Sequence, residues 1–390
     1  MERQSSWEIY PLDYEVFIGL DVDKKSMAVT SFNHKEQLNS VKMPNNAEKL
    51  INYTRKRYAG KKVAFAYEVG PTGYGLYDEL NKSGYECLVV NPSSVPIASG
   101  RKVKTNRLDS IQIAKGLRGG ELKSVRVPET KYRDLRHLIQ LYDTVVKGSR
   151  ANKCRIKALL LMEGISYPGA IGSDWSNNTI EELGKIDCRE MVRIKLDLLL
   201  EDLKFQIEKK KKINLEIRRY CETDKDLSES VEYLISIPGI GRTIAVHLLA
   251  KTGDWRNLKN VRELGSFIGL TPSERSTGED INKGRITHAG DARLRNMLVE
   301  GAWTAIRKDP ELTEFYNRIY KRHPIKVAAR KAIIAVARKM TGRIYRVLKD
   351  RRKYVVREVS EEIRFNKKRR HCAPKDDSTY RRTCKQLQVR

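Results

Sequence analysis

The N-terminal part of this chain takes its fold from the run EVFIGLD (residues 15–21). This run is almost unbroken in its apolar character and ends on a carboxylate, which predicts a buried strand with Asp21 at its carboxyl end. Residues 22–25 (VDKK) are turn-like. The next apolar run, SMAVTSF (residues 26–32), therefore predicts a second strand that pairs back on the first as a hairpin.

Strand and helix patterns alternate after this hairpin. Short apolar runs predict strands, and apolar residues at helical spacing predict helices. The sequence predicts strands over residues 37–43, 62–68 and 85–90, and helices over residues 47–58, 76–83 and 108–117. The order strand-strand-strand-helix-strand-helix-strand-helix is that of a ribonuclease-H-like α/β domain.

Three carboxylates fall where such a domain gathers its acids. Asp21 ends the first strand, Glu68 ends the fourth, and Asp109 lies on the last helix. The carboxyl ends of strands in an open α/β sheet meet in one crevice, so we expect these side chains to converge there. Carboxylate oxygens are ligands that Mg²⁺ prefers, and two such ions can act on a phosphodiester. The alternative for each is a solvated surface acid, which is how we interpret Asp23.

An actin-like ATPase fold is the competing interpretation, because it also opens with a strand that ends in Gly-x-Asp. This half of the sequence has no second glycine loop of the phosphate-binding kind. The ribonuclease-H-like fold is therefore favoured.

The charge of the chain indicates a polyanionic partner. Its 390 residues carry 77 Lys and Arg against 49 Asp and Glu, a formal net charge of +28. This excess suits nucleic acid or an acidic membrane surface. No apolar run is long enough to span a bilayer and the N-terminus lacks a signal-peptide pattern, so nucleic acid is favoured and we expect a cytoplasmic protein. The six cysteines form no CxxC pair, which indicates neither a zinc site nor a disulfide framework.

Two long helices are predicted in the middle of the chain, over residues 132–162 and 189–220. Apolar residues recur in both at helical spacing. Such a pair indicates an antiparallel hairpin or a coiled coil. It serves either as a structural spacer or as a dimerisation arm with a basic face for nucleic acid, and both functions are compatible with the sequence.

The segment LISIPGIGRT (residues 234–243) lies between two predicted helices and is typical of a helix-hairpin-helix motif. Gly239 and Gly241 would let the turn approach a phosphate, and Arg242 begins a helix whose N-terminus attracts anions. The alternative is an ordinary helical corner.

Two polar segments follow, GLTPSERSTG (residues 269–278) and KGRITH (residues 283–288). They lack apolar periodicity, so neither an amphipathic helix nor a buried strand is predicted. Hydroxyls beside Gly and Arg suit a phosphate-handling loop, which needs a small nucleophile and cations. Taken alone, the same residues favour a polar surface loop.

Further basic residues are predicted to contact a nucleic-acid backbone. They lie before the helix over residues 108–117 and in the second polar segment, and the tail over residues 351–390 is also dominated by Arg and Lys. We expect this tail to be disordered alone and ordered on nucleic acid. The predicted contacts are Arg101, Lys102, Lys104, Arg107, Lys283 and Arg285.

Together these features resemble the insertion-sequence "one-ten" family of transposases. Residues 234–252 and 264–298 are similar to the C-terminal transposase domain of that family. The family's N-terminal domain is RuvC-like and carries a DEDD acid set, which is matched here by Asp21, Glu68, Asn106 and Asp109. The third acid is thus an amide in this chain, which can ligate Mg²⁺ through its oxygen but without the charge.

The resemblance implies a DNA transposase or recombinase that needs Mg²⁺ and is guided by a structured bridge RNA. It implies that Ser276 attacks a DNA phosphodiester and forms a covalent phosphoserine link, with Thr277 as the alternative nucleophile and Arg275 beside them. Family members form dimers that pair into tetramers, in which the acids of one subunit complete the site around the serine of another. The implied partners are donor and target DNA, and the implied location is the nucleoid of a prokaryotic cell.

The sequence predicts four regions: a RuvC-like acid domain (1–125), a helical coiled-coil arm (126–225), a mainly helical C-terminal domain with the nucleophile loop (226–350) and a basic tail (351–390). Three other functions stay open. A site-specific DNA invertase would use the same chemistry. A Holliday-junction-type nuclease would use only the acids and water. A non-catalytic nucleic-acid-binding relative is the third, and Asn106 lends it weight.

Overall fold

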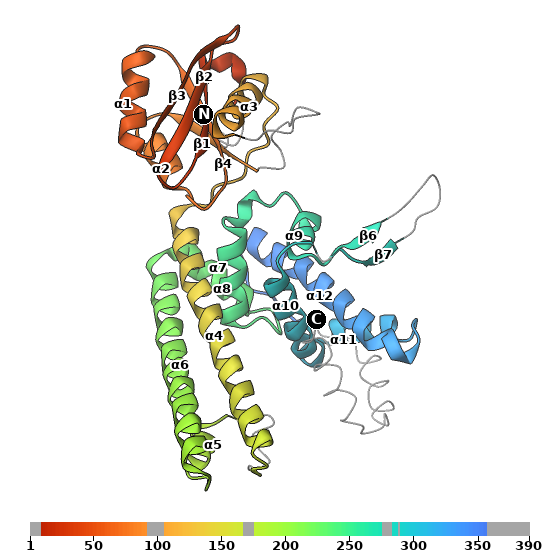
Figure 1. Cartoon of the computed structure of the whole chain (residues 1–390). Helices are drawn as coiled ribbons and strands as arrows, with labels where there is room; N and C mark the ends of the chain where they lie inside the picture. Colours follow the sequence, from red (N-terminus) through yellow and green to blue (C-terminus); the bar gives the residue numbers. More distant parts are fainter. Residues whose placement is uncertain (1–8, 92–104, 167–174, 275–282, 288, 357–390) are drawn as a thin grey trace. The chain divides into compact units, whose positions relative to one another are not determined.

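Contacts within the chain divide it into two units, between Pro128 and Glu129. The computed structural model describes residues 9–91, 105–166, 175–274, 283–287 and 289–356 (Figure 1). Within those ranges, no helix combines the length and the apolar character needed to cross a membrane.

The first unit is built on a five-stranded mixed sheet with the strand order β3-β2-β1-β4-β5. Its strands are β1 (Val16–Val22), β2 (Ser26–Phe32), β3 (Gln37–Pro44), β4 (Val63–Glu68) and β5 (Glu86–Val90). β1, β2 and β3 pair antiparallel, whereas β4 runs parallel to β1 and β5 runs parallel to β4. Parallel neighbours need a crossover connection, and helices supply it here.

Helices cover both faces of this sheet (Figure 1). They are α1 (Ala47–Arg57), α2 (Gly75–Lys82) and α3 (Asn106–Gly119), and a short 3-10 turn, η1 (Pro11–Asp13), precedes β1. α1 and α2 pack on one face, and α3 packs on the other. The order of strands and helices predicted from the sequence is confirmed, from the first strand to α3.

The alternation of side chains along β1 explains these layers. Ile18 and Leu20 point into the core under α1 and α2, while Phe17 points toward α3. All three are fully buried. Burial contributes about 1.5–3 kcal/mol for each large apolar side chain. Because both faces are covered, β1 reads as a continuous apolar run and not as an alternation of polar and apolar residues.

The second unit begins with two long helices that pack against each other, α4 (Thr130–Met162) and α6 (Glu190–Thr223). They run antiparallel, because Arg189 beside the start of α6 pairs with Glu163 beside the end of α4. At the opposite end, the Lys131 ammonium lies 3.1 Å from the Asp224 carboxylate. The predicted antiparallel hairpin is confirmed, and a coiled-coil packing of the two helices stays a prediction.

Shorter helices complete the second unit: α5 (Asn177–Gly184), α7 (Lys225–Ile235), α8 (Arg242–Thr252), η4 (Trp255–Asn257), α9 (Val261–Ile268), α10 (Ala292–Lys308), α11 (Pro310–Tyr320) and α12 (Ile325–Lys349). Two short strands, β6 (Pro272–Glu274) and β7 (Lys283–Ile286), form a separate sheet. One apolar core joins α7 to α12 with the adjoining halves of α4 and α6. Another lies between α5 and the far halves of the long helices. The second unit is thus mostly helical, as predicted.

Candidate active site

Asp21 and Glu68 lie at the carboxyl ends of two neighbouring strands, where Asp21 is the last residue but one of β1 and Glu68 is the last residue of β4. In the parallel register of β1 and β4, Leu20 pairs with Tyr67, and the two acids are the next residues along their strands. Both acidic side chains are half-buried. The register therefore brings these two acids to neighbouring positions, as the carboxyl ends of parallel strands require.

The two acids also share one face of the sheet. Side chains alternate along a strand, so Asp21 projects on the side of Gly19, and Glu68 projects on the side of Ala66. Ala66 belongs to the apolar core under α3. Both acids therefore lie on the face that α3 covers.

Gly19 allows α3 to lie close to β1. A Cβ atom at this position would overlap the backbone of Ser110 and Ala114. Ser110 is fully buried, and its hydroxyl donates to the Arg107 carbonyl over 2.8 Å. Because that hydroxyl has one proton, it accepts from the Thr30 hydroxyl on β2, 2.8 Å away. These contacts fix the first turn of α3 against β1 and β2.

Asn106 and Asp109 stand on this first turn of α3. They share a stripe with Ile113, which packs on the sheet, because residues three and four apart lie on one face of a helix. Asp109 is half-buried and Asn106 is exposed. The Asn106 amide nitrogen donates a hydrogen bond to the Asp23 carboxylate in the turn between β1 and β2. This bond places the start of α3 beside the end of β1, and we call Asp21, Glu68, Asn106 and Asp109 together the acid edge.

Asp23 is a further polar residue at the acid edge. Asp23 is predicted from the sequence to be a solvated acid, and its side chain is exposed, yet it accepts the hydrogen bond from Asn106. Its place two residues after Asp21, in a tight turn, is the sequence signal that could have identified it. An amide at position 106 suits this neighbour, because an acid there would bring two negative charges together.

The donor atoms of the acid edge are oxygens of carboxylate and amide groups, a set that suits a hard cation such as Mg²⁺. In the described ranges, no group of three or more His, Cys, Asp or Glu side chains is arranged so that it could hold a metal ion. Asp21, Glu68 and Asp109 each take part in other interactions within the chain. The donor atoms thus fit Mg²⁺. The residues that carry them lie at two strand ends and on one helix turn, and they do not form a closed ligand shell.

The predicted nucleophile belongs to a hairpin in the second unit. β6 and β7 pair antiparallel and project from the helices around them (Figure 1). The segment that joins them, 275–282, lies outside the described ranges, and it contains Arg275, Ser276 and Thr277. The sequence does not predict the two strands, because strands of 3 and 4 residues with polar side chains show no alternation.

Close backbone packing and one buried arginine hold the base of this hairpin. Gly269 has a φ of +77° and Gly290 a φ of +90°, and a Cβ atom on either would overlap backbone atoms of the facing segment. A left-handed φ is best tolerated by glycine. Arg295 of α10 is 8% exposed, and its guanidinium donates to the Ile268 carbonyl over 3.2 Å. The hairpin therefore rises from a fixed base.

The two glycines in the turn between α7 and α8 differ in their surroundings. Gly239 has a φ of +87° and packs so closely on α10 that an added Cβ would overlap the Gly301 carbonyl. Internal packing therefore explains this glycine. Gly241 is the N-cap of α8 with open space beside it, and Arg242 lies 3.5 Å from Glu232. Of the two glycines, Gly241 has room for a phosphate beside it. The helix-hairpin-helix assignment stays a prediction.

Some of the other predicted nucleic-acid contacts lie in the described ranges. Arg107 is exposed on the first turn of α3, and Arg285 is exposed on β7, which begins at Lys283. Outside the described ranges lie Arg101, Lys102 and Lys104.

Comparisons with known proteins identify the family. Residues 231–317 match the family model described as Transposase IS116/IS110/IS902 family. Residues 18–163 match a model described as Transposase, for DEDD transposases of the IS110 type. The first match contains the β6–β7 hairpin, and the second contains the acid edge.

Related proteins span most of the chain. The protein y4qE of Sinorhizobium fredii, which is named as a transposase, is 31% identical over 346 residues, or 87% of this chain and 84% of that protein. The transposase for insertion sequence element IS1533 of Leptospira borgpetersenii is 23% identical over 300 residues, or 74% of this chain and 85% of that protein. The pilin gene-inverting protein of Moraxella bovis is 28% identical over 131 residues, or 33% of this chain and 40% of that protein. The chain therefore belongs to the IS116/IS110/IS902 family of transposases, which act in DNA transposition.

Proposed function

We propose that this transposase cuts and rejoins DNA through a covalent seryl-phosphate intermediate, with Ser276 as the nucleophile. We further propose that the acid edge holds Mg²⁺. The observation that carries the proposal is the meeting of the ends of β1 and β4 with the first turn of α3. The serine lies in the segment that joins β6 to β7, and the fixed base of that hairpin supports a role that requires positioning.

The proposed step exchanges one phosphodiester bond for another. The Ser276 oxygen forms a bond to phosphorus, the bond from phosphorus to the departing DNA strand breaks, and the hydroxyl proton reaches the departing oxygen by way of solvent. Bound Mg²⁺ would neutralise charge on the phosphate and lower the pKa of the serine hydroxyl. Arg275, Lys283 and Arg285 are the nearby cations in the sequence and supply further positive charge. The reverse step, with a hydroxyl of another DNA strand as the attacking group, rejoins DNA and frees the serine.

Donor DNA, target DNA and a bridge RNA are the proposed nucleic-acid partners. The net charge of +28 supports binding to all of them. A guide RNA that selects both DNA sites accords with this charge and with the resemblance described above. Such a protein would act at the nucleoid of a prokaryotic cell.

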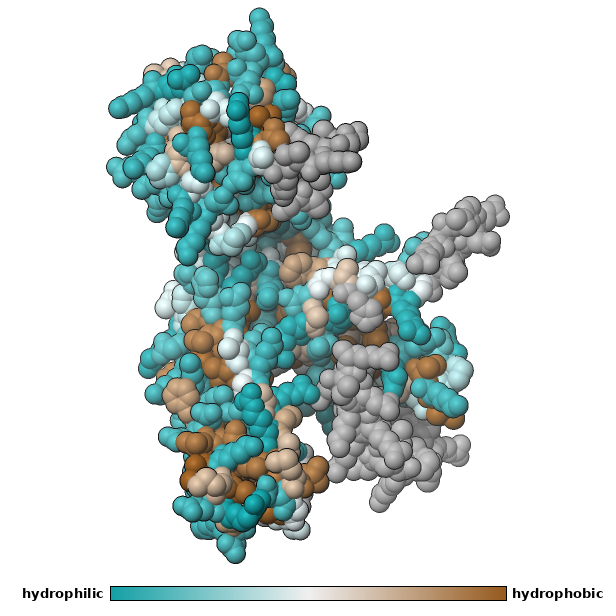
Figure 2. Space-filling model, viewed as in Figure 1, coloured by the Kyte–Doolittle hydropathy of each residue, from teal (hydrophilic) through white to brown (hydrophobic). Residues whose placement is uncertain are grey.

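The long helices support self-association into dimers or tetramers. On α6, Met191, Ile194, Leu198 and Phe205 recur at spacings of three, four and seven residues and are 47–70% exposed. Figure 2 shows apolar residues gathered over the far end of the long helices. A repeat of this kind is the pattern through which helices of two copies pair.

Trapping a covalent protein–DNA adduct tests the nucleophile. Wild-type protein with Mg²⁺, guide RNA and donor DNA is expected to yield an adduct that survives denaturation. Ser276→Ala is expected to yield none while still binding nucleic acid. Ser273→Ala is the matched control, because Ser273 lies on β6 and its hydroxyl donates to the Arg285 carbonyl over 3.0 Å. A normal adduct in Ser276→Ala that disappears in Thr277→Ala would transfer the role to Thr277.

A site-specific DNA invertase is the second candidate, and the match to the pilin gene-inverting protein of Moraxella bovis favours it. Both candidates form the adduct, whereas a metal nuclease that uses water forms none. A plasmid with two sites in opposite orientation separates them. Inversion of the DNA between the sites supports the invertase, and insertion of a donor circle into a target supports the transposase. A non-catalytic relative would cleave no strand under these conditions.

A further inference from the structure

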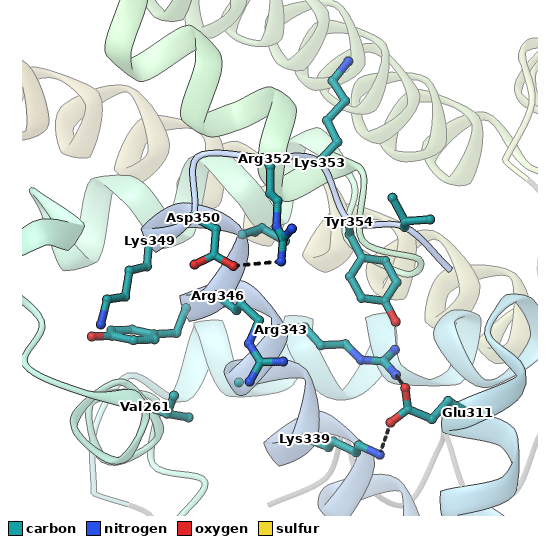
Figure 3. A pocket seen from close by; sticks show the side chains of 14 residues that line it. Val261, Glu311, Lys339, Arg343, Arg346, Lys349, Asp350, Arg352, Lys353 and Tyr354 are labelled. Carbon is teal, nitrogen blue, oxygen red and sulfur yellow. Dashed lines mark hydrogen bonds and ion pairs between the residues drawn. The ribbon is translucent and has the colours of Figure 1, made fainter. Parts of the chain in front are cut away.

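A basic cavity lies beside the C-terminal end of α12. Its volume is about 760 Å³, and it is framed by the last turns of α12, the segment 350–355, Glu311 of α11 and Val261 of α9 (Figure 3). Six Lys and Arg side chains line it, against the carboxylates of Glu311 and Asp350. The proposed strand-transfer reaction uses none of these residues.

Two of the six cations, Lys339 and Arg343, are already neutralised by carboxylates. The Lys339 ammonium lies 2.6 Å from the Glu311 carboxylate. The Arg343 guanidinium lies 3.0 Å from Glu311 and also pairs with Asp309, which is fully buried. A buried pair of this kind keeps its geometry, because separating it would leave a charge unpaired. These residues shape the cavity.

The segment after α12 forms one wall of the cavity. The Tyr354 hydroxyl donates to the Asp309 carboxylate over 2.8 Å, and the Tyr354 backbone nitrogen donates to the Ser236 hydroxyl over 2.7 Å. The Arg343 guanidinium lies 4.9 Å from the centre of the Tyr354 ring, at a distance that suits a cation–π contact. The cavity is thus held open by contacts within the protein.

Arg346 and Lys349 are the cations that this network leaves available. Both are exposed, and neither has a carboxylate at ion-pair distance in the part of the chain that the structure describes. The Arg352 guanidinium lies 3.2 Å from the Asp350 carboxylate and forms an ion pair with it. Figure 3 shows Arg346 in the middle of the labelled side chains, while Lys353 extends away from the others. The positive charge available to a ligand is therefore concentrated on two residues of α12.

We propose that this cavity binds the phosphodiester backbone of a nucleic acid, with Arg346 and Lys349 contacting phosphate oxygens. Two cations that pair with none of the described carboxylates, on a concave surface formed in advance, suit a ligand that carries repeated negative charges. The sequence continues from the cavity into residues 357–390, which hold eleven Lys and Arg against five Asp and Glu, and this also favours a polyanion. The proposal rests on the action of the family on DNA and on no part of the serine chemistry.

The salt dependence of binding measures the number of phosphate contacts. We compare the full-length protein with Arg346→Gln/Lys349→Gln, using a fluorescent duplex DNA and a fluorescent RNA hairpin as separate probes. Loss of two contacts is expected to reduce the slope of log K against log salt by about 1.8 for duplex DNA and to weaken binding roughly tenfold near physiological salt. Arg55→Gln/Lys56→Gln is the matched control, because it also removes one Arg and one Lys from an exposed surface, that of α1.

Substitutions at two further positions distinguish a ligand bound in the cavity from general attraction to a positively charged protein. Gly342 lines the cavity, and a Cβ atom there would make only an ordinary contact with Val261. Gly342→Leu is therefore expected to fold, to fill the cavity and to weaken binding without a change of charge, whereas Gly342→Ala keeps normal binding. Asp350→Asn removes the acid that pairs with Arg352 and is expected to tighten binding.

The results with the two probes decide whether the cavity binds a nucleic acid and which one. A smaller slope for both probes supports a site for any phosphodiester, and a smaller slope for one probe assigns the cavity to that nucleic acid. Equal slopes for Arg346→Gln/Lys349→Gln and the α1 control would overturn the proposal. Unchanged binding by Gly342→Leu, with thermal unfolding at the wild-type temperature, would also overturn it. At saturating DNA these variants are expected to keep adduct formation through Ser276, so failure of the cavity and failure of the serine chemistry give different results.

Discussion

Asn106 is the one member of the acid edge that carries no carboxylate. The family pattern has an acid there, whereas Asn106 donates its amide hydrogen to the Asp23 carboxylate. An acid at this position would lose that bond and face a second carboxylate, so the two would repel in the absence of a cation. A divalent cation bound at the acid edge would turn the same two groups into ligands.

Asn106→Asp is therefore expected to raise strand-transfer activity at saturating Mg²⁺. It is also expected to lower the melting temperature in chelator and to enlarge the rise that Mg²⁺ produces, which thermal unfolding with and without Mg²⁺ measures. Asn106→Ala is the control, because it removes the hydrogen bond to Asp23 without adding charge. Lower activity with no added effect of Mg²⁺ would show that position 106 does not ligate the ion.

At the level of elements, the close approach of α3 to β1 depends on Gly19. Gly19→Ala is expected to destabilise the protein by about 1–3 kcal/mol, because the added Cβ would overlap Ser110 and Ala114 and push α3 outward. Strand cleavage is expected to fall further than stability alone explains, since Asp109 moves with the helix. Urea unfolding and a cleavage assay measure the two effects. Gly75→Ala on α2 is the control, because nothing lies within 4 Å of its added Cβ. Equal unfolding free energies for the two variants would contradict the expectation.

The hairpin that carries the proposed nucleophile depends on Arg295 at its base. Arg295→Met is expected to cost about 1–3 kcal/mol, because it leaves the Ile268 carbonyl without its buried donor. The yield of covalent adduct is expected to fall while affinity for DNA stays near the wild-type value. Arg293→Met on the same helix is the control, because Arg293 pairs with Asp143 with a side chain that is 42% exposed, and exposed pairs contribute about 0–1 kcal/mol. Equal yields of covalent adduct in Arg295→Met and Arg293→Met would show that Arg295 does not position the hairpin.

In the second unit as a whole, two carboxylates at the start of α7 form ion pairs with segments that are distant in the sequence. Asp224 accepts from the Leu227 backbone nitrogen over 2.8 Å and lies 3.1 Å from Lys131 of α4. Asp226 pairs with Arg256 of η4. The Leu227 N–H group and then Lys131 hold the pKa of the Asp224 carboxyl below its usual value, and the Arg256 guanidinium does the same for the pKa of Asp226.

These lowered pKa values determine the sign of the pH dependence. A carboxyl whose pKa is lower in the folded than in the unfolded state binds fewer protons when folded. Its stabilisation is therefore present above the unfolded pKa of about 4 and is lost as the pH falls through the folded value. We expect the free energy of unfolding, measured by denaturant titration, to drop below about pH 4.

Asp226→Asn tests this account of acid sensitivity. The variant is expected to be less stable than wild type at pH 7 and to lose less stability on acidification, because it has one carboxyl fewer to protonate. Asp202→Asn, which changes an exposed carboxyl of α6, is the control and is expected to follow the wild-type curve. A parallel curve for Asp226→Asn and wild type would rule out this carboxyl as a source of the acid sensitivity.

Local patterns were enough to identify the elements of the first unit, the antiparallel long helices and the family. The run over residues 15–21 predicts β1, and Asp21 and Glu68 mark the ends of two strands. Strand and helix periodicity and the position of a residue at the end of an element are properties of neighbouring residues, so the chain reveals them directly.

Contacts between distant residues required the folded chain. Gly239 lies in a motif typical of phosphate binding, yet it packs against Gly301. Asn106 donates to Asp23, and the cavity around Arg346 is closed by the segment after α12. Each of these depends on which segments meet in space and on the register at which they meet. Side chains far apart in the sequence share no local pattern, so packing and register alone set these neighbours.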